Sequence, residues 1–351
     1  MVLWIFLGVV ALALLFFCVM AVGAAVVFCR FFGRRYNGNR FVKYFTAEDF
    51  AGLEAEPIAF PSDEGQVLRG YLYKSSPARE QRALIIFSHG FGAGHLAYTT
   101  EIHALAKAGF LALAYDGTGC GESGGDSLRG FDQGPIDLDF ALRFAAKDPR
   151  LKDLPKILVG HSWGAFTALN ALAFHPEVCG AVGLCGFVSG AGVMAQTVFH
   201  RVQPCKAVFA FCLRVLNRIR FGKRANQNTI RALLRTERPV LLCYGLQDRV
   251  VPYYGNGKKV LQKCRERKNI RQLLFEDKGH NVYLSNEAES YMNTTFRSIA
   301  KQVKKDPSRA EVLYKRVDYY KMTEEDESVM RSILDFCGEI ADLLPDAAAK
   351  G

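Results

Sequence analysis

The pattern of apolar and polar positions divides the chain into two unlike parts. From Val2 to Cys29 no charged residue occurs, and Val, Leu, Phe and Ala predominate. After a polar stretch, short apolar runs alternate with segments in which apolar residues recur at helical spacing. The runs in the middle of the chain are continuously apolar, as expected for strands that helices cover on both faces.

This alternation predicts an α/β fold with a mostly parallel central sheet and helices on both faces. The predicted strands are Pro57–Phe60, Val67–Tyr73, Ala83–Ser88, Phe110–Tyr115, Ile157–Val159, Ala181–Cys185, Val240–Tyr244 and Gln272–Phe275. The predicted helices are Thr99–Ala108, Gly134–Ala146, Trp163–Phe174, Gly257–Lys263, Glu287–Val303 and, near the end of the chain, Glu324–Leu344.

The first apolar segment is long enough to cross a bilayer, which takes about 20 residues. It is too long for the apolar core of a signal peptide, and no Lys or Arg precedes it. We therefore predict a transmembrane anchor over residues 1–32, with a cleaved signal near Ala21–Ala24 as the alternative. A polar linker (33–56), a catalytic domain (57–304) and a C-terminal helical extension (305–351) are expected to follow.

Charge and cysteine usage favour a cytoplasmic location for the body of the protein. The net charge is +10, and a group of cations directly follows the apolar segment: Arg30, Arg34, Arg35, Arg40 and Lys43. Positive flanks remain on the cytoplasmic side, although these cations can also contact lipid headgroups on either face. The ten cysteines form no C-x-x-C pair, so neither a zinc site nor a disulfide framework is predicted.

The first candidate for chemistry is Ser162 in the sequence Gly160-His-Ser-Trp-Gly164. The pattern G-x-S-x-G is common by chance. It indicates a nucleophile where it forms a tight turn between a strand and a helix, because that turn projects the hydroxyl above the sheet. The predicted strand Ile157–Val159 precedes the pattern and the helix-prone stretch Ala165–Ala173 follows it, so the required context is present.

A serine nucleophile needs a base and an orienting carboxylate. Asp248 follows the predicted strand Val240–Tyr244, and His280 follows the last predicted strand. Taken alone, such an Asp most often caps a turn and such a His is most often a surface residue. Together with Ser162 they stand in the chain order Ser, Asp, His of one known triad architecture. Asp277 is the rival for the carboxylate.

Backbone donors for a negative oxygen are expected from the glycine-rich loop Ser88-His-Gly-Phe-Gly92. The predicted donors are the N–H groups of Phe91 and of Trp163, the residue after the nucleophile. His89 is expected to shape this loop and not to act as the base.

Five short motifs together resemble the α/β-hydrolase superfamily: HGFG, YDGTGCGESGG (Tyr115–Gly125), GHSWG, GLQDRVVP and KGH. Within it, the chain is similar to the branch of monoacylglycerol lipases, serine aminopeptidase-like proteins and membrane-anchored ABHD-type hydrolases, over about residues 57–304. Thr118 stands where the family commonly has arginine, which affects how that turn is held. The resemblance implies an ester, thioester or amide hydrolase that works through an acyl-enzyme.

In this fold a lid often enters at a position that corresponds here to residues 186–237. No Asp or Glu occurs between Glu177 and Glu237, whereas nine Lys and Arg residues do. Apolar residues recur at helical spacing at Val208, Cys212, Val215 and Ile219. This basic amphipathic helix is predicted either to lie on anionic lipid or admit acyl chains, or to pack its apolar face on the body.

The sequence therefore predicts a membrane-anchored, single-pass serine hydrolase that cleaves an ester or thioester of a fairly apolar acylated substrate. A peptidase or amidase of the same fold, an acyltransferase and a catalytically silent membrane scaffold are the alternatives. No P-loop, no glycine-rich dinucleotide motif opening a helix and no His-rich cluster occurs, so no cofactor or metal is expected. No nucleic-acid-binding module accompanies the positive charge, and a nucleic-acid partner is not predicted.

Overall fold

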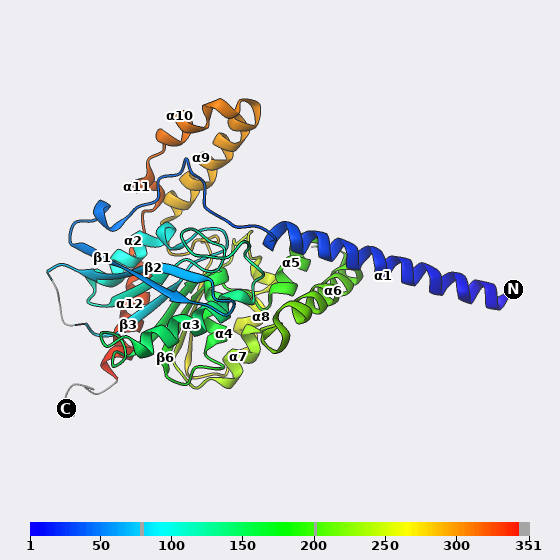
Figure 1. Ribbon diagram of the computed structural model, residues 1–351, viewed down its shortest axis with the longest axis horizontal. Coiled ribbons are helices and arrows are strands. Elements are labelled where there is room, and N and C mark those ends of the chain that lie inside the picture. The colour runs from blue at the N-terminus through cyan, green and yellow to red at the C-terminus, as the bar shows by residue number, and fades with distance from the viewer. Residues whose placement is uncertain (78–80, 200–201, 344–351) are drawn as a thin grey trace.

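An eight-stranded sheet with helices on both faces forms the body of the protein, and one long helix projects from it (Figure 1). The computed structural model describes residues 1–77, 81–199 and 202–343. The strand order is β1-β2-β4-β3-β5-β6-β7-β8. β1 and β2 run antiparallel to each other, β2 is antiparallel to β4, and the remaining neighbours are parallel.

All eight predicted strands are present. Their bounds are β1 Leu53–Pro61, β2 Val67–Ser75, β3 Leu84–Ser88, β4 Leu111–Tyr115, β5 Lys156–His161, β6 Val178–Leu184, β7 Val240–Gly245 and β8 Ile270–Phe275. β1 begins four residues before the predicted start at Pro57, inside the stretch that was expected to be linker. Strands β3 to β7 are buried along their whole length, apart from one half-buried position in β6. This burial explains why apolar and polar residues do not alternate in their sequences.

Two layers of helices cover the sheet. Buried side chains of α2 (Thr99–Lys107) and α12 (Glu327–Asp342) share one core with one face of the sheet. Those of α3 (Gln133–Lys147), α4 (Trp163–Ala171), α7 (Thr229–Arg235) and α8 (Gly257–Lys263) share a second core with the other face. Near the edge lie α9 (Asn286–Lys305), α10 (Ala310–Lys315) and α11 (Tyr319–Met322).

Helix α12 is part of this packing. Its predicted apolar positions Val329, Ile333, Phe336 and Ile340 are all buried against the sheet and α2. The helix begins at Glu327 because the Asp326 carboxylate caps it, accepting the N–H groups of Ser328 and Val329. Leu344, the predicted end of this helix, lies outside the described residues.

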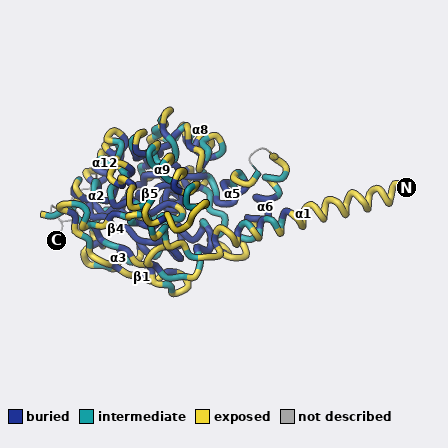
Figure 2. The backbone as a smooth tube through the Cα atoms, turned by 90° about the horizontal axis from the view of Figure 1, so that it is seen from above, coloured by how far each residue is buried: buried dark blue, intermediate teal, exposed yellow. Residues whose placement is uncertain are grey.

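The N-terminal apolar segment forms a single helix, α1 (Val2–Phe32), that is long and apolar enough to cross a membrane. A membrane anchor and a signal sequence share this property. Its outer part is exposed, whereas Met20, Ala24, Phe28 and Phe32 are buried at i, i+4 spacing (Figure 2). The inner part of α1 is therefore packed on the body of the protein.

The insert at residues 186–237 contains α5 (Gly190–Val198), α6 (Gln203–Phe221) and α7, with α6 beside α1 (Figure 1). The predicted apolar face of α6 is present, but only part of it is covered. Cys212 is buried in the cluster that includes Ala24 and Phe28 of α1, whereas Val215 is 44% and Ile219 is 77% exposed. The part of this face at Val208 and Cys212 packs in that cluster, whereas the part at Val215 and Ile219 is left uncovered.

Two carboxyl groups lie within the core between α2 and the segment before α12. Glu101 is buried, and this burial, together with the charge of Glu325, raises its pKa well above the usual range. Burial raises the pKa of Glu325 to about 7, and its Oε1 has no hydrogen-bond partner in the described residues. A raised carboxyl pKa means that the folded protein holds a proton that the unfolded chain releases.

We expect the Glu325 carboxyl to make the free energy of unfolding fall as pH rises from about 4.5 to about 7, because its folded-state pKa lies above the unfolded one. Glu325→Gln should reduce that fall by on the order of 2 kcal/mol. Denaturant unfolding across this pH range measures it, with the exposed neighbour in Glu324→Gln as the control. Equal pH dependence in wild type and Glu325→Gln would contradict the assignment.

Candidate active site

Ser162 occupies a strained turn between β5 and α4. Its φ is 57° and its ψ is −113°, a left-handed conformation that side chains other than glycine rarely adopt. The turn is tight enough that a Cβ added at Gly160 would overlap the Gly164 carbonyl, and one added at Gly164 would overlap the Ser88 carbonyl. Both glycines of the motif are therefore required by close backbone contact, and the strand–turn–helix context predicted from the sequence is present.

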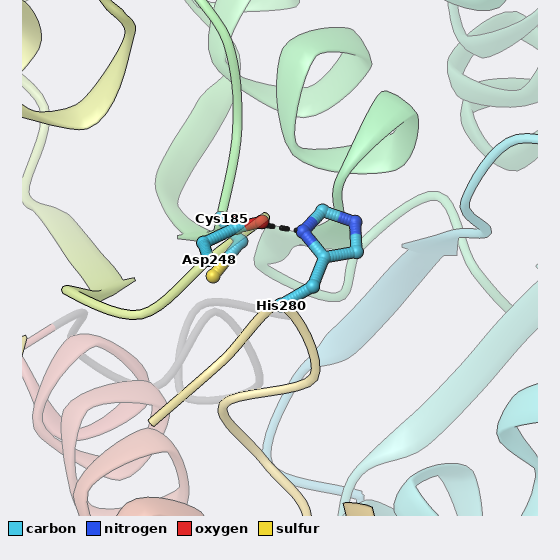
Figure 3. Close-up of side chains that lie close together, drawn as sticks. All are labelled: Cys185, Asp248 and His280. Atoms are coloured by element: carbon cyan, nitrogen blue, oxygen red, sulfur yellow. Dashed lines mark hydrogen bonds and ion pairs between the residues drawn. The ribbon is translucent and has the colours of Figure 1, made fainter. Parts of the chain in front are cut away.

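Asp248 and His280 meet at the ends of neighbouring strands. His280 Nδ1–H donates to Asp248 Oδ2 at 2.7 Å, and both side chains are largely buried (Figure 3). The other carboxylate oxygen, Oδ1, accepts the N–H groups of Val250 and Val251, each at 2.8 Å. The carboxylate is thus held in place by its own loop, and its hydrogen bond leaves the lone pair of a neutral His280 on Nε2.

The rival carboxylate lies elsewhere. Asp277 accepts a hydrogen bond from the Asn286 side chain at 2.6 Å in an exposed position, so it does not orient His280. Asp248 is the carboxylate that contacts the imidazole.

His161 links the turn of Ser162 to the loop of His280. Its Nε2–H donates to the His280 carbonyl at 3.0 Å, and the two imidazole rings are 4.7 Å apart between centroids. In the described residues no hydrogen bond joins Ser162 Oγ to His280, a contact that often tightens only when substrate binds. The structure therefore brings the three elements together, and the catalytic roles of Ser162, Asp248 and His280 stay predictions.

A buried tyrosine ties the glycine-rich loop to the same centre. Tyr98 Oη accepts the Gly90 N–H at 3.0 Å, and its hydroxyl donates to His161 Nδ1 at 2.9 Å. Burial lowers the pKa of His161 well below its usual value, so the ring is neutral and its Nδ1 can accept this hydrogen. Sequence analysis did not single out Tyr98 or His161, because each is joined to the site only through the fold.

The N–H groups of Phe91 and Trp163, the predicted oxyanion donors, stay predictions in that role. In the described part of the chain neither donates to another protein group, so both are available to an external acceptor. His89 is buried behind the loop, where its Nδ1–H donates to the Gly90 carbonyl and its Nε2 accepts the Gly117 N–H. Both of its ring nitrogens are engaged, which fits the predicted structural role.

Thr118, which replaces the arginine common in the family, is held by a buried carboxylate. Asp137 accepts the Thr118 N–H at 2.7 Å and its hydroxyl at 2.8 Å, together with hydrogen bonds from Ser62 and Gln133. The threonine therefore secures this turn against α3 without a charged side chain.

Cys185 lies beside the Asp248–His280 pair (Figure 3). Its sulfur, an Asp248 oxygen and a His280 nitrogen all lie within 4.8 Å of one another, close enough to suggest a metal site. Burial and the charge of Asp248 raise the pKa of the Cys185 thiol well above its usual value, and the thiol donates to the Gly279 carbonyl at 3.8 Å. The Asp248 carboxylate accepts three hydrogen bonds from the protein, and these account for the position of the pair without a metal ion.

Aromatic side chains of α1 and of the segments next to Ser162 pack into one cluster, which we call the apolar cover. It consists of Phe28 and Phe32 of α1 together with Phe91, Phe131, Trp163 and Phe187. The Phe32 ring, 1% exposed, is 5.8 Å from that of Phe91 and 4.9 Å from that of Phe131. Sequence analysis missed the contribution of α1, because an all-apolar helix gives no pattern that distinguishes a packed face from a lipid-facing one.

Residues 79–237 match the family described as serine aminopeptidase, S33. Esterase YjfP of Escherichia coli is 31% identical over 177 residues, which are 48% of this chain and 69% of the relative. The chain belongs to this serine aminopeptidase-like family of α/β-hydrolases. A monoglyceride lipase homolog of Monkeypox virus is 21% identical over 73% of this chain and 90% of that protein.

The solved structures agree on the fold. The esterase Pf2001 of Pyrococcus furiosus superposes with a TM-score of 0.55 at 18% identity, covering 78% of this chain and 98% of that chain. The α/β-hydrolase fold predicted from the sequence is thereby confirmed. The chain spans less than half the length of several other curated relatives that it matches.

Gly164→Ala should destabilise the protein strongly, because its Cβ would overlap the Ser88 carbonyl and backbone atoms cannot move aside as a flexible side chain can. We expect a loss of about 3 kcal/mol or more in the free energy of unfolding, measured by denaturant titration. Gly23→Ala is the control, because its nearest neighbour is a Phe209 ring atom at 3.8 Å. A Gly164→Ala protein as stable as this control would show that the turn is not tight.

Proposed function

We propose that the protein is a membrane-anchored serine hydrolase that cleaves an ester or thioester of a fairly apolar acylated substrate. The observation that carries the proposal is the Asp248–His280 hydrogen bond of 2.7 Å in the loops beside the strained turn of Ser162. A carboxylate-oriented imidazole next to a hydroxyl on such a turn is the arrangement that activates a serine.

In the proposed reaction Ser162 Oγ attacks the carbonyl carbon while His280 Nε2 takes the hydroxyl proton. Asp248 holds the imidazole with Nε2 unprotonated and stabilises the imidazolium that forms. The N–H groups of Phe91 and Trp163 donate to the oxygen that becomes negative. The imidazolium then gives its proton to the departing alcohol or thiol. Water, activated by the same imidazole, releases the acyl group from Ser162.

An apolar acyl group is favoured by the apolar cover, because this cluster includes Phe91 and Trp163, the residue after Ser162. Burying such surface stabilises a bound chain by about 25 cal/mol per Å². Thr118 and Asp137 are hydrogen-bonded to each other, so these two groups offer little to a polar substrate.

Membrane anchoring is supported by the exposed part of α1. Residues 2–19 are exposed along the helix, and at 1.5 Å per residue they span roughly 27 Å, close to the thickness of a bilayer core. We place the body on the cytoplasmic side on the strength of the cations after the helix. Arg35, one of them, donates instead to the carbonyls of Gly121 and Gly125, which fixes the end of α1 to the glycine-rich turn.

Ser162→Ala should abolish covalent labelling by a fluorophosphonate probe and reduce the turnover of p-nitrophenyl esters by a factor on the order of 10⁶. Labelling is measured by in-gel fluorescence, and turnover is compared for esters of increasing chain length. Ser298→Ala, at an exposed position of α9, is the matched control. Undiminished labelling of folded Ser162→Ala protein would contradict the proposed nucleophile, and a preference for aminoacyl amides over esters would favour the peptidase.

Asp248→Asn should lower kcat by a factor of about 10⁴, because an amide nitrogen facing His280 favours the tautomer whose Nε2 is protonated. The Val250 and Val251 N–H groups can still bond to the remaining oxygen, so the fold should persist. Asp277→Asn is the control and should retain near wild-type kcat in the same ester assay. The reverse ranking of the two variants would exchange the roles of the two carboxylates.

A further inference from the structure

A polar cavity of about 360 Å³ lies between α6 and the start of α5, away from Ser162. Arg214, Asn217 and Arg218 of α6 line one side of this α6 cavity. Its other lining residues come from the start of α5 and from the segment that leads into α7, and they are Ser189, Gly190, Ala191, Ala225, Asn226, Asn228 and Arg231. All of its charged lining residues are arginines.

The charge of the α6 cavity is not balanced by the protein. None of the three arginines forms an ion pair within the part of the chain that the structure describes. Arg218 donates one hydrogen bond, to the Gly222 carbonyl. No acidic residue occurs between Glu177 and Glu237, the stretch that contains all three arginines. Asp132 is buried, and its carboxylate accepts hydrogen bonds from the backbone N–H groups of Asn226, which lines the cavity, and of Gln227. Three guanidinium groups facing one polar space are suited to bind an oxyanion.

A buried, unpartnered side chain independently indicates a ligand. Asn217 is only 6% exposed and lines the cavity, yet its Oδ1 has no hydrogen-bond partner in the described residues. A buried amide oxygen without a partner is costly, and native proteins rarely leave one unsatisfied. An acceptor beside three cations matches a ligand that carries both a phosphate and a hydroxyl group.

The cavity opens beside apolar surface that is continuous with α1. Phe211, Val215 and Ile219 follow one another at i, i+4 spacing on α6 and are all exposed, next to Arg214 and Arg218 on the helix surface. The Phe211 ring is 6.3 Å from that of Phe17 on the exposed part of α1. A lipid headgroup in the cavity would therefore have its acyl chains next to apolar side chains that already face away from the protein.

We propose that the α6 cavity binds the phosphate group of a hydroxyl-bearing anionic headgroup, such as that of phosphatidylglycerol. The guanidinium groups of Arg214, Arg218 and Arg231 bond the phosphate oxygens, and Asn217 Oδ1 accepts the hydroxyl. This site makes no use of Ser162, His280 or Asp248, so it goes beyond the proposed hydrolase activity and can be tested without it.

The test uses the full chain in a neutral detergent and measures binding by isothermal titration calorimetry. The probes are dihexanoyl phosphatidylglycerol, dihexanoyl phosphatidylcholine and sn-glycerol 3-phosphate. We expect the combined change Arg214→Gln, Arg218→Gln and Arg231→Gln to weaken phosphatidylglycerol binding by at least about tenfold, because charge-assisted hydrogen bonds to the phosphate are lost. Asn217→Asp, which places a negative charge at the cavity wall, should weaken it similarly.

The matched control removes three exposed cations from α9 and α12, in Arg297→Gln, Lys301→Gln and Arg331→Gln, and should bind like wild type. Phosphatidylglycerol binding that exceeds glycerol 3-phosphate binding identifies a lipid headgroup, whereas equal binding of the two identifies a soluble polyol phosphate in the same site. Phosphatidylcholine binding equal to phosphatidylglycerol binding, affinity retained in the arginine variant, or equal loss in the control would overturn the proposal. The ester turnover of the arginine variant is measured separately, and it tests the proposed hydrolase activity and not the headgroup site.

Discussion

The backbone contact between the end of β3 and the start of α4 is the constraint on which the rest of the site depends. Gly164 lies so close to the Ser88 carbonyl that no side chain fits between them. This contact forces Ser162 into its left-handed conformation and brings the loop of Phe91 alongside the first N–H groups of α4. Tyr98 and His161 extend the same constraint to the loop of His280. One steric condition thus sets the relative positions of four separate chain segments.

The apolar helix at the N-terminus takes part in this arrangement. Phe28 and Phe32 are packed among the aromatic residues above the site, and Phe32 contacts Phe91 directly. Because of this contact, a movement of α1 relative to the body would displace the loop that contains Phe91, one of the proposed oxyanion donors. The exposed apolar residues of α6 adjoin the exposed part of α1, because the Phe211 ring lies 6.3 Å from that of Phe17.

Much of the fold was predictable, because buried parallel strands produce continuous apolar runs and because Ser162, Asp248 and His280 each follow such a run. From the sequence, strand context alone favoured Asp248 over Asp277, and in the structure it is Asp248 that forms the hydrogen bond to His280. The packed face of α1 was not predictable, since every face of that helix is apolar. The partial covering of the apolar face of α6 was not predictable either, because it depends on where α1 crosses that helix. Cys185, Tyr98 and His161 join the site only through tertiary contacts.

The central claim is that Ser162 carries the acyl group during turnover. The most direct measurement is mass spectrometry of the Asp248→Asn protein, rapidly quenched in acid during reaction with a p-nitrophenyl ester. A mass increase equal to the acyl group is expected on the peptide that contains Ser162 and is expected to disappear as substrate is exhausted. Continued ester turnover with no acyl group on that peptide, or with the group on Cys185 or another residue, would contradict the proposed mechanism.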